Sequence, residues 1–423
     1  MNRQDFHPHI LILDCLWLQR LKQSVMRVHR TCSLIVMGII SIPGIAEEMT
    51  PSQPIVWHGF ASQALIITDH NRFFGPSDKA SLDMTEIGLN GSIQWTPHIR
   101  TAAQVLSRRA GKMDNGTPDL DYGLFDLRLH TTMHQQFGLY LGRIKNPIGL
   151  YNETRDVAFT RQGIFSPQSI YFDKVRDLLL SSDGVQFYSH TSLASGTLSV
   201  RAGSGYPLVD RNVGMAYLGQ NYGGTLKGQQ PAYIGQIMYE LFGGRWIISA
   251  SALTTTLKFH PTAADRLSGL DTGKVGIDYS VLSAQFNGEK WRLTSEMAFE
   301  TIHFQGISAF HQSISSHSLG YYLEASYQWH PQWQSFIRHE RFYVDKHDKY
   351  GKNYAVRDPF LSARSRYSRI WATGVRWNIT ASWMVRAEYQ THIGTAILSP
   401  AENNLNTAYK HWDLFAMAVS YRF

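Results

Sequence analysis

Apolar residues occupy every second position near the carboxyl end of the chain. This set comprises Phe415, Met417, Val419, Tyr421 and Phe423, and Phe423 is the final residue. Because successive side chains of a strand point to opposite faces, the spacing predicts a strand with one apolar face. The edge strand of a soluble β-sandwich has the same period, so this segment by itself leaves both architectures open.

Four further segments alternate in the same way. They lie at 246–252, 291–300, 319–329 and 385–390. In most of them the apolar set alternates with charged or amide side chains, as Arg386 and Glu388 do between Val385 and Tyr389. This is the pattern expected when one face of a sheet meets lipid and the other meets water.

Connections between the predicted strands alternate in length. Short turns are predicted at 96–97, 130–136, 190–196, 242–245, 287–290, 331–332 and 378–382. Long polar connections are predicted at about 68–84, 110–119, 146–182, 204–230, 258–273, 302–317, 344–367 and 392–410. Seven short and eight long connections imply 16 strands, with 14 or 18 as alternatives if a turn is misplaced. Antiparallel barrels that span membranes have even strand numbers and this alternation of turns and loops.

Tryptophan residues gather beside the short turns. The set comprises Trp95, Trp246, Trp291, Trp329, Trp333, Trp377 and Trp383. Amphipathic rings prefer the headgroup level of a bilayer, so the set indicates an interfacial girdle. The fold class that we predict is therefore all-β, a transmembrane antiparallel barrel.

The amino-terminal residues have the features of an export signal. An apolar run at 33–46 follows the basic residues Arg27 and Arg30 and ends in small residues at Gly44 and Ala46. This order predicts a cleaved signal peptide within a leader of residues 1–46, followed by a single barrel domain at 47–423. A membrane anchor is the alternative, but the run is shorter than the roughly 20 residues that a spanning helix needs. Met26 is an alternative start.

Composition narrows the classes further. Only Cys15 and Cys32 are present, both within the leader, which excludes a disulfide scaffold. No run of 18 apolar residues exists, which excludes a helical membrane protein. The leader carries five of the Lys and Arg residues and two of the Asp and Glu residues, so its removal lowers the formal charge from +7 to +4. Basic residues are dispersed along the chain, and we expect no nucleic-acid partner.

The segment 142–152, GRIKNPIGLYN, resembles bacterial outer-membrane porins, as do Thr154-Arg155-Asp156 and the stretch 182–185. The resemblance is moderately specific and covers about 45 residues. It implies that the third long loop, about 146–180, folds into the lumen and narrows it. It also implies a homotrimer in the outer membrane, in contact with lipid and lipopolysaccharide. An aromatic residue at the end of the last strand is similar to the assembly signal of such barrels, which would be formed by Tyr421 and Phe423.

The third loop and the polar strand faces supply the predicted pore-lining residues. On the loop these are Glu153, Arg155, Asp156, Arg161 and Asp173. On the wall they are Arg100, Arg108, Arg128, Arg143, Lys145, Arg338, Arg376 and Arg386. The polar phase of the strands contains ten basic wall candidates, with Arg201 and Arg292 included, against five acidic ones: Asp126, Glu296, Glu324, Glu340 and Glu388. Rings of Arg or Lys favour anions, so this excess predicts a weak anion preference. Pairing of each arginine with a neighbouring carboxylate is the alternative.

We therefore expect a porin that passes small hydrophilic solutes by passive diffusion, with no catalytic step, no cofactor and no metal site. A channel selective for phosphate or an organic acid is the alternative within this class. A barrel enzyme or a ligand receptor is the alternative outside it, although no catalytic or phosphate-binding motif is present. The facing of the fifth strand stays open, because Leu139 and Leu141 share a phase with Arg143 and Lys145.

Overall fold

A computed structural model describes residues 55–219, 222–308, 311–357 and 361–423. The leader predicted at 1–46 and the cleavage site predicted near Ala46 lie outside these described residues. No helix in the described part of the chain is long and apolar enough to cross a membrane.

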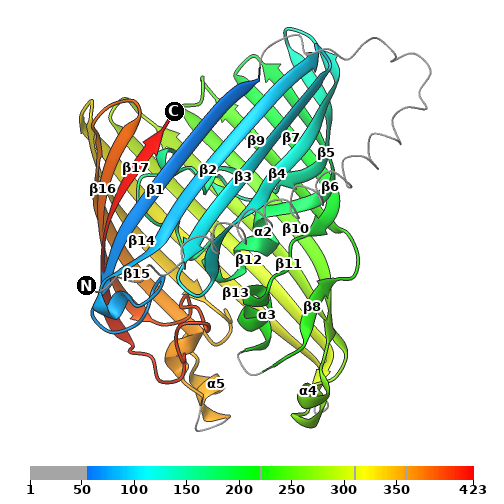
Figure 1. Ribbon diagram of the computed structural model, residues 1–423, viewed down its shortest axis with the longest axis vertical. Helices are drawn as coiled ribbons and strands as arrows, with labels where there is room; N and C mark the ends of the chain where they lie inside the picture. The colour runs from blue at the N-terminus through cyan, green and yellow to red at the C-terminus, as the bar shows by residue number, and fades with distance from the viewer. Residues whose placement is uncertain (1–54, 220–221, 309–310, 358–360) are drawn as a thin grey trace, which may run out of the picture. The chain divides into compact units, whose positions relative to one another are not determined.

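Strands form one antiparallel sheet that closes on itself (Figure 1). They are β1 (Val56–Thr68), β2 (Ser81–Thr96), β3 (Ile99–Ala110), β4 (Asp114–Thr131), β5 (Gln135–Lys145), β6 (Ser181–Leu193), β7 (Gly196–Pro207), β8 (Thr225–Gly228), β9 (Ala232–Leu241), β10 (Trp246–His260), β11 (Gly273–Asn287), β12 (Trp291–Ser308), β13 (His311–His330), β14 (Trp333–Tyr343), β15 (Tyr367–Asn378), β16 (Trp383–Gly394) and β17 (His411–Arg422). The ring closes because β1 pairs with both β2 and β17. Since β8 and β9 pair with successive parts of β10, the 17 segments occupy sixteen positions around the barrel, which confirms the predicted strand number.

Helical turns lie only in the long connections of the described chain. The α-helices are α2 (Arg176–Leu180), α3 (Arg211–Leu218), α4 (Ala263–Leu267) and α5 (Lys352–Val356). The 3-10 turns are η1 (Ser77–Lys79), η2 (Asn152–Thr154), η3 (Ala158–Thr160), η4 (Asp173–Val175) and η5 (Ala363–Arg366). Figure 1 shows α4 and α5 at the end of the barrel opposite the carboxyl terminus. We call these two ends the long-connection end and the short-turn end.

All seven short turns predicted from the sequence join consecutive strands. Two of the predicted long connections are wrong. Only three residues separate β3 from β4, and β12 continues to Ser308 before β13 begins at His311. Residues 115–119 of β4 are mostly exposed on both faces, so pairing continues there without an apolar face to mark it. Alternation indicates a strand only where one face is buried.

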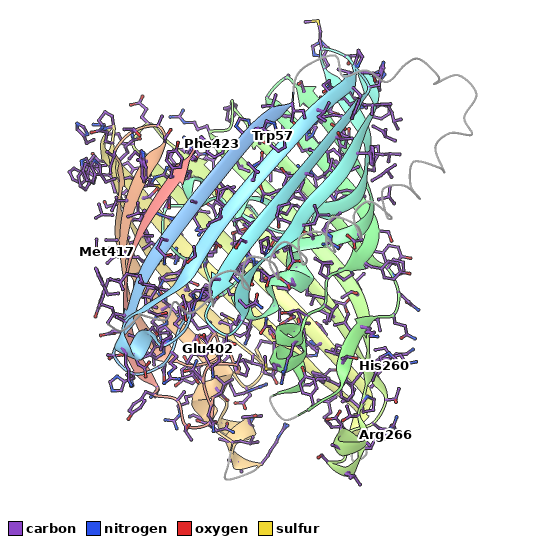
Figure 2. The ribbon with its side chains drawn as sticks, viewed as in Figure 1. Trp57, His260, Arg266, Glu402, Met417 and Phe423 are labelled. Atoms are coloured by element: carbon purple, nitrogen blue, oxygen red, sulfur yellow. The ribbon has the colours of Figure 1, made fainter. Side chains whose placement is uncertain are left out.

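The outward face is apolar across the middle of the barrel. Met417 and Val419 of β17 are 44% and 47% exposed, whereas Ala416 and Ala418, in the opposite phase of the strand, are buried. Figure 2 labels Met417 on the side of the barrel. Aromatic rings from neighbouring strands contact one another at the short-turn end, including Trp333 with Trp377, whose ring centroids are 5.1 Å apart. These features fit a sheet whose outer face meets hydrocarbon and whose strand ends meet headgroups.

Apolar side chains also fill part of the barrel interior. The inward residues Leu257 and Ile277, near the long-connection ends of β10 and β11, belong to one buried cluster. The same cluster includes Phe165 and Ile170, from the connection between β5 and β6, and Phe74, from the connection between β1 and β2. The interior at the long-connection end is thus packed rather than lined only by polar groups.

The register of β5 with β6 shows which side chains of β5 face outward. Leu139 lies opposite Phe187 and Leu141 lies opposite Val185 in the register of β5 and β6. Phe187 and Val185 are 37% and 42% exposed, and partners in a ladder share a face. Both leucines therefore face outward, and no folded loop is needed to cover them.

Candidate functional site

The connection between β5 and β6, residues 146–180, lies inside the barrel; we call it the inserted segment. Its backbone N–H groups donate to side chains from the far wall. Gly149 donates to Ser251 Oγ of β10 (2.9 Å), Leu150 to Glu296 Oε1 of β12 (2.9 Å) and Ser169 to Glu340 Oε2 of β14 (3.1 Å). Since these partners belong to three strands opposite β5, the segment crosses the lumen, as the sequence predicted.

Wall charges are matched to the polarity of the segment's backbone. Glu388 Oε2 accepts from the N–H groups of Ile164 (2.5 Å) and Phe165 (3.3 Å). Arg376 Nη1 donates to the carbonyl oxygen of Phe159 (3.1 Å), and Arg386 donates to that of Gly163. Wall carboxylates thus accept hydrogen bonds from backbone N–H groups of the segment, and wall guanidinium groups donate to its backbone carbonyl oxygens. Such charge-assisted hydrogen bonds are stronger than neutral ones and fix the position of the segment.

Glu296 is the most fully satisfied of these carboxylates. In addition to Leu150, it accepts hydrogen bonds from Tyr171 Oη (2.7 Å), Tyr322 Oη (2.8 Å) and Ser283 Oγ (2.7 Å). A carboxylate has about four lone-pair positions, and a buried charge is tolerated when they are filled. Glu296 therefore acts as a fixed anchor for the start of the segment.

Arg338 is the centre of a buried ion-pair cluster on the wall. Its guanidinium lies 3.0 Å from Glu324, 2.7 Å from Glu340 and 3.4 Å from Glu388, measured from nitrogen to oxygen, and the residue is only 1% exposed. Two of these glutamates also hold the inserted segment. Arg338 therefore offsets part of the negative charge of Glu340 and Glu388, which bind the segment.

A second cluster joins the segment to β2 and β3. Arg108 contacts Glu86 (3.3 Å) and Asp173 (2.9 Å), Arg155 contacts Asp173 (3.4 Å), and Arg161 contacts Glu86 (3.5 Å). The predicted residues Arg108, Arg155, Arg161 and Asp173 are thus brought together. Because each cation has a carboxylate, their charges largely cancel.

A third cluster lies where the inserted segment begins, at the end of β5. Lys145 contacts Asp121 at 2.7 Å and also contacts Asp156, which pairs with Arg176. Asp121 is an extra residue of β4, where the register with β3 shifts. After Arg143, β5 has no register partner on β4. The contact of Lys145 with Asp121 therefore connects the two strands where their backbone pairing has ended.

Three predicted cations lie toward the short-turn end and also have acidic partners. Arg100 and Arg128 lie 3.5 Å and 3.6 Å from Asp126, and Arg201 pairs with the segment residue Glu153. The side chain of Arg100 is 39% exposed, so this region is more accessible to solvent than the buried clusters described in the preceding paragraphs.

Arg143 does not join the interior clusters. It pairs with Asp183 of β6 at 2.7 Å and shares the outward phase of Leu141. Its Nη1 also donates to the carbonyl oxygen of Leu120 (2.9 Å). Arg143 was predicted to line the constriction; the structure places it against Asp183 and the backbone of β4, where it lines a cavity toward the long-connection end.

Three predicted arginines have no carboxylate within 4.0 Å among the described residues, namely Arg292, Arg376 and Arg386. Arg422 of β17, which the sequence reasoning missed, is a fourth. The inward phase of β17, opposite Phe415 to Phe423, contains Arg422, so the same alternation would have revealed it. Glu86 and Asp121 were also missed; alternation along β2 marks Glu86, whereas no pattern marks the extra residue Asp121.

Two cavities lie on either side of the inserted segment. The cavity toward the long-connection end has a volume of about 210 Å³ and is lined by six aspartates and three arginines. The acidic residues are Asp114, Asp119, Asp121, Asp173, Asp177 and Asp210, and the basic ones are Arg108, Arg143 and Arg176. Burial and the nearby charge of Asp177 raise the pKa of Asp210, which precedes α3. We call this the acidic cavity.

The cavity at the short-turn end has a volume of about 350 Å³. Arg376 and Arg422 are its only charged lining residues, and Phe159 of the inserted segment forms one side. We call this the arginine cavity. The interior is therefore suited to holding and sorting charged solutes. No group of three or more metal-ligating side chains occurs in the described ranges.

Tyr421 and Phe423, predicted as an assembly signal, lie at the seam of the barrel. Phe423 N donates to the carbonyl oxygen of Gly59 (3.1 Å), and the ring of Phe423 is 59% exposed. Figure 2 shows Phe423 beside Trp57 at the short-turn end. Their role in assembly stays a prediction.

Solved structures of outer-membrane proteins share this architecture. The outer membrane channel DcaP of Acinetobacter baumannii matches with a TM-score of 0.55 and 10% identity, over 90% of this chain and 100% of that one. The anion-selective porin from Comamonas acidovorans matches with a TM-score of 0.54 and 11% identity, over 88% and 99%. Salmonella typhi OmpF, in complex with daunomycin, matches with a TM-score of 0.51 and 11% identity, over 87% and 97%.

No family model and no curated protein sequence matches the chain. At identities near one in ten, the similarity to solved structures concerns the fold. The barrel closes with sixteen strand positions, an apolar outer face and an inserted third connection. The chain thus has the fold of the Gram-negative outer-membrane porins.

Proposed function

We propose that this chain is an outer-membrane channel through which small hydrophilic solutes diffuse passively. The observation that carries the proposal is the inserted segment, held across a closed barrel by charged wall residues. A packed core would not require this arrangement, whereas a channel uses it to set the width and charge of the passage. The proposal includes no covalent step and no cofactor.

A weak anion preference is part of the proposal. Most interior arginines contact carboxylates, so the preference rests on those that do not, Arg292, Arg376, Arg386 and Arg422. A channel selective for an anion such as phosphate or an organic acid is the second candidate, favoured by the arginine cavity. The anion selectivity named for the Comamonas porin is consistent with either.

The remaining parts of the proposal concern location and partners. We propose that residues 1–46 direct export and are cleaved near Ala46, that Tyr421 and Phe423 are read during assembly, and that the channel is a homotrimer. The short-turn end then faces the periplasm. These parts are tested by amino-terminal sequencing of the mature protein, by truncation of Phe423 and by the native mass of the purified protein.

A row of lysines supports contact with anionic outer-leaflet lipid such as lipopolysaccharide. Lys258 of β10 lies opposite both Lys227 of β8 and Lys274 of β11, on the outward face. Like charges directly opposite one another destabilise a sheet unless anions neutralise them. Lys258 is twelve residues from Trp246, which at about 3.3 Å per residue and a tilt near 40° puts it roughly 30 Å from that girdle, at headgroup level.

Planar-bilayer recording tests the channel. Folded protein is expected to give stepwise conductance, and a salt gradient is expected to give a reversal potential of the sign that marks anion preference. Heat-denatured protein is the control. Absence of conductance from folded, heat-modifiable protein would refute the channel. Turnover of a lipid or peptide by the same preparation would replace it with a barrel enzyme.

A further inference from the structure

The arginine cavity is formed where four parts of the chain meet. The turn between β13 and β14 contributes Gln332, and the turn between β15 and β16 contributes Asn378 and Thr380. Arg422 comes from the last strand, and Phe159 comes from the inserted segment. The cavity therefore lies at the end of the barrel where Figure 2 labels Phe423.

Both arginines are held in place through only part of their guanidinium groups. Arg376 donates from Nε to Asn378 Oδ1 (2.9 Å) and from Nη1 to the carbonyl oxygens of Phe159 (3.1 Å) and Arg161 (3.3 Å). Arg422 donates from Nε to the carbonyl oxygen of Ala381 (3.0 Å), and its Cζ lies 4.3 Å from the centroid of the Phe159 ring. Among the described residues, no hydrogen bond uses Nη2 of Arg376 or either terminal nitrogen of Arg422.

No carboxylate lines this cavity, so neither guanidinium has a counter-ion within the described protein. Arg386 adds to the imbalance, because it is the register partner of Arg376 on β16. Arg386 is 1% exposed, and its Nε and Nη2 have no hydrogen-bond partner among the described residues. Buried donors without partners are uncommon and point to a group that completes them.

We infer that the arginine cavity is a binding site for a small oxyanion, a phosphate or a carboxylate, at the short-turn end of the channel. A guanidinium presents paired N–H groups that match the oxygens of such anions. The free nitrogens of Arg376 and Arg422 supply these groups, and a volume near 350 Å³ is at the small end of ligand cavities. The inference deepens the proposed channel function and rests on it for the route by which the anion arrives.

A purely structural role is the competing explanation. In that case Arg376 would only hold the carbonyl groups of the inserted segment, and Arg422 would only cover Phe159 and the turn at Ala381. Both roles require the contacts described above. The two explanations differ on the free terminal nitrogens, because only a binding site uses them.

Calorimetric titration of inorganic phosphate into the folded, detergent-solubilised full chain tests the site without requiring conduction. Saturable binding with one site per chain is expected. Replacement of Arg422 by glutamine (R422Q) removes one charge-assisted contact and is expected to weaken binding about tenfold, which corresponds to about 1.4 kcal/mol. R422K keeps the charge but not the paired N–H geometry, and its affinity is expected to lie between the two.

Arg245 provides the matched control. It lies in a short turn at the same end of the barrel, between β9 and β10, and its Cζ lies 5.9 Å from the Phe286 ring centroid, but it does not line the cavity. R245Q makes the same change in net charge and is expected to leave phosphate affinity unchanged. Equal weakening in R245Q and R422Q, or no saturable binding by the wild-type protein, would overturn the site. A channel that conducts while failing this test would retain its proposed function without the site.

Discussion

The two cavities of the barrel interior differ in how their charges are balanced. Toward the long-connection end, the acidic cavity has twice as many aspartates as arginines, and several of these groups are already paired. At the short-turn end, the arginine cavity has two guanidinium groups and no carboxylate. The inserted segment separates them. The preference of the channel for anions or cations therefore depends less on the total number of basic and acidic residues in the interior. It depends more on which of these residues are paired in each cavity.

The difference follows from where carboxylates are needed. Glu340 and Glu388 accept hydrogen bonds from backbone N–H groups of the inserted segment, and both contact Arg338. Arg376 and Arg386 donate to backbone carbonyl oxygens of the segment instead, and neither has an ion pair with a carboxylate in the described part of the chain. These two anions thus share a cation in direct contact, whereas the two cations have no carboxylate in contact.

The largest expected effect is a difference in the free energy of unfolding between variants of Arg338, which contacts carboxylates, and of Arg376, which does not. Replacing Arg338 by alanine leaves Glu324, Glu340 and Glu388 buried without their cation and is expected to lower the free energy of unfolding by roughly 3–5 kcal/mol. Replacing Arg376 by alanine strands no carboxylate and is expected to cost only about 1–2 kcal/mol, from the lost hydrogen bonds. Urea titration of both variants in lipid vesicles measures the difference. Equal losses would mean that the Arg338 cluster is not the main support.

Removing the cations of the arginine cavity is expected to reverse the ion preference. In the double variant R376Q/R422Q the arginine cavity has no charged lining residue, while the buried Arg386 remains, so the acidic cavity is expected to dominate and the channel to favour cations. A unit charge at about 7 Å in water changes local ion energy by about 0.6 kcal/mol, or about threefold in concentration, for each arginine. Reversal potentials in a salt gradient measure the ratio. An unchanged sign would show that these arginines do not face the permeating ion.

Neutralising the acidic cavity is the complementary change. Asp177→Asn combined with Asp210→Asn is expected to raise anion permeability about threefold relative to cations, which is less than the effect of the arginine pair because Asp210 is partly buried. The exposed Asp271 of the connection after α4 offers a control at the same end. Asp271→Asn is expected to have no effect, and an effect equal to that of the double variant would contradict a local role for the acidic cavity.

The smallest expected effect is a dependence on pH. Because the pKa of Asp210 is raised, it takes up a proton as pH falls from neutrality, before ordinary aspartates do so near about 3.9. Protonation removes one negative charge from the acidic cavity, so anion preference should rise over this range. In Asp210→Asn the same pH change should shift the reversal potential less than in the wild-type protein, because only Asp114 and Asp119 of the same cavity still take up protons there. An equal shift in the two proteins would assign the titration to groups other than Asp210.

Alternation along the chain was sufficient to predict the barrel, because lipid on one face and protein or water on the other impose a period of two on every spanning strand. It failed at 110–119, where β4 continues with no buried face to mark it, and at 302–317, where β12 continues to Ser308 although Ile302 and Ile307 on it are buried. The inward fold of the loop after Lys145 was implied by the resemblance of residues 142–152 to porins, not by alternation.

The pairing of charges was only partly within reach of sequence reasoning. Arg338 and Arg376 have the same strand phase and lie on neighbouring strands, yet one contacts three glutamates and the other none. Glu340 and Glu324 lie in the same phase on β14 and on the adjacent β13, so alternation marks them, whereas the carbonyl groups that Arg376 binds belong to the inserted segment and only the folded chain brings them there. Strand phase also misplaces Lys145, which shares the phase of the outward leucines but pairs with Asp121 and Asp156 inside the barrel.

The central claim is that the inserted segment narrows a diffusion channel. Single-channel conductance tests it most directly, in a variant whose residues 157–170 are replaced by a short glycine-serine linker. A variant shortened by the same means at α4, in the connection at 261–272, is the control, and heat modifiability confirms folding of both. Conductance of the first variant is expected to rise about twofold or more over the wild-type protein, with the control unchanged. Equal conductance of the wild-type protein and a folded 157–170 variant would contradict the claim.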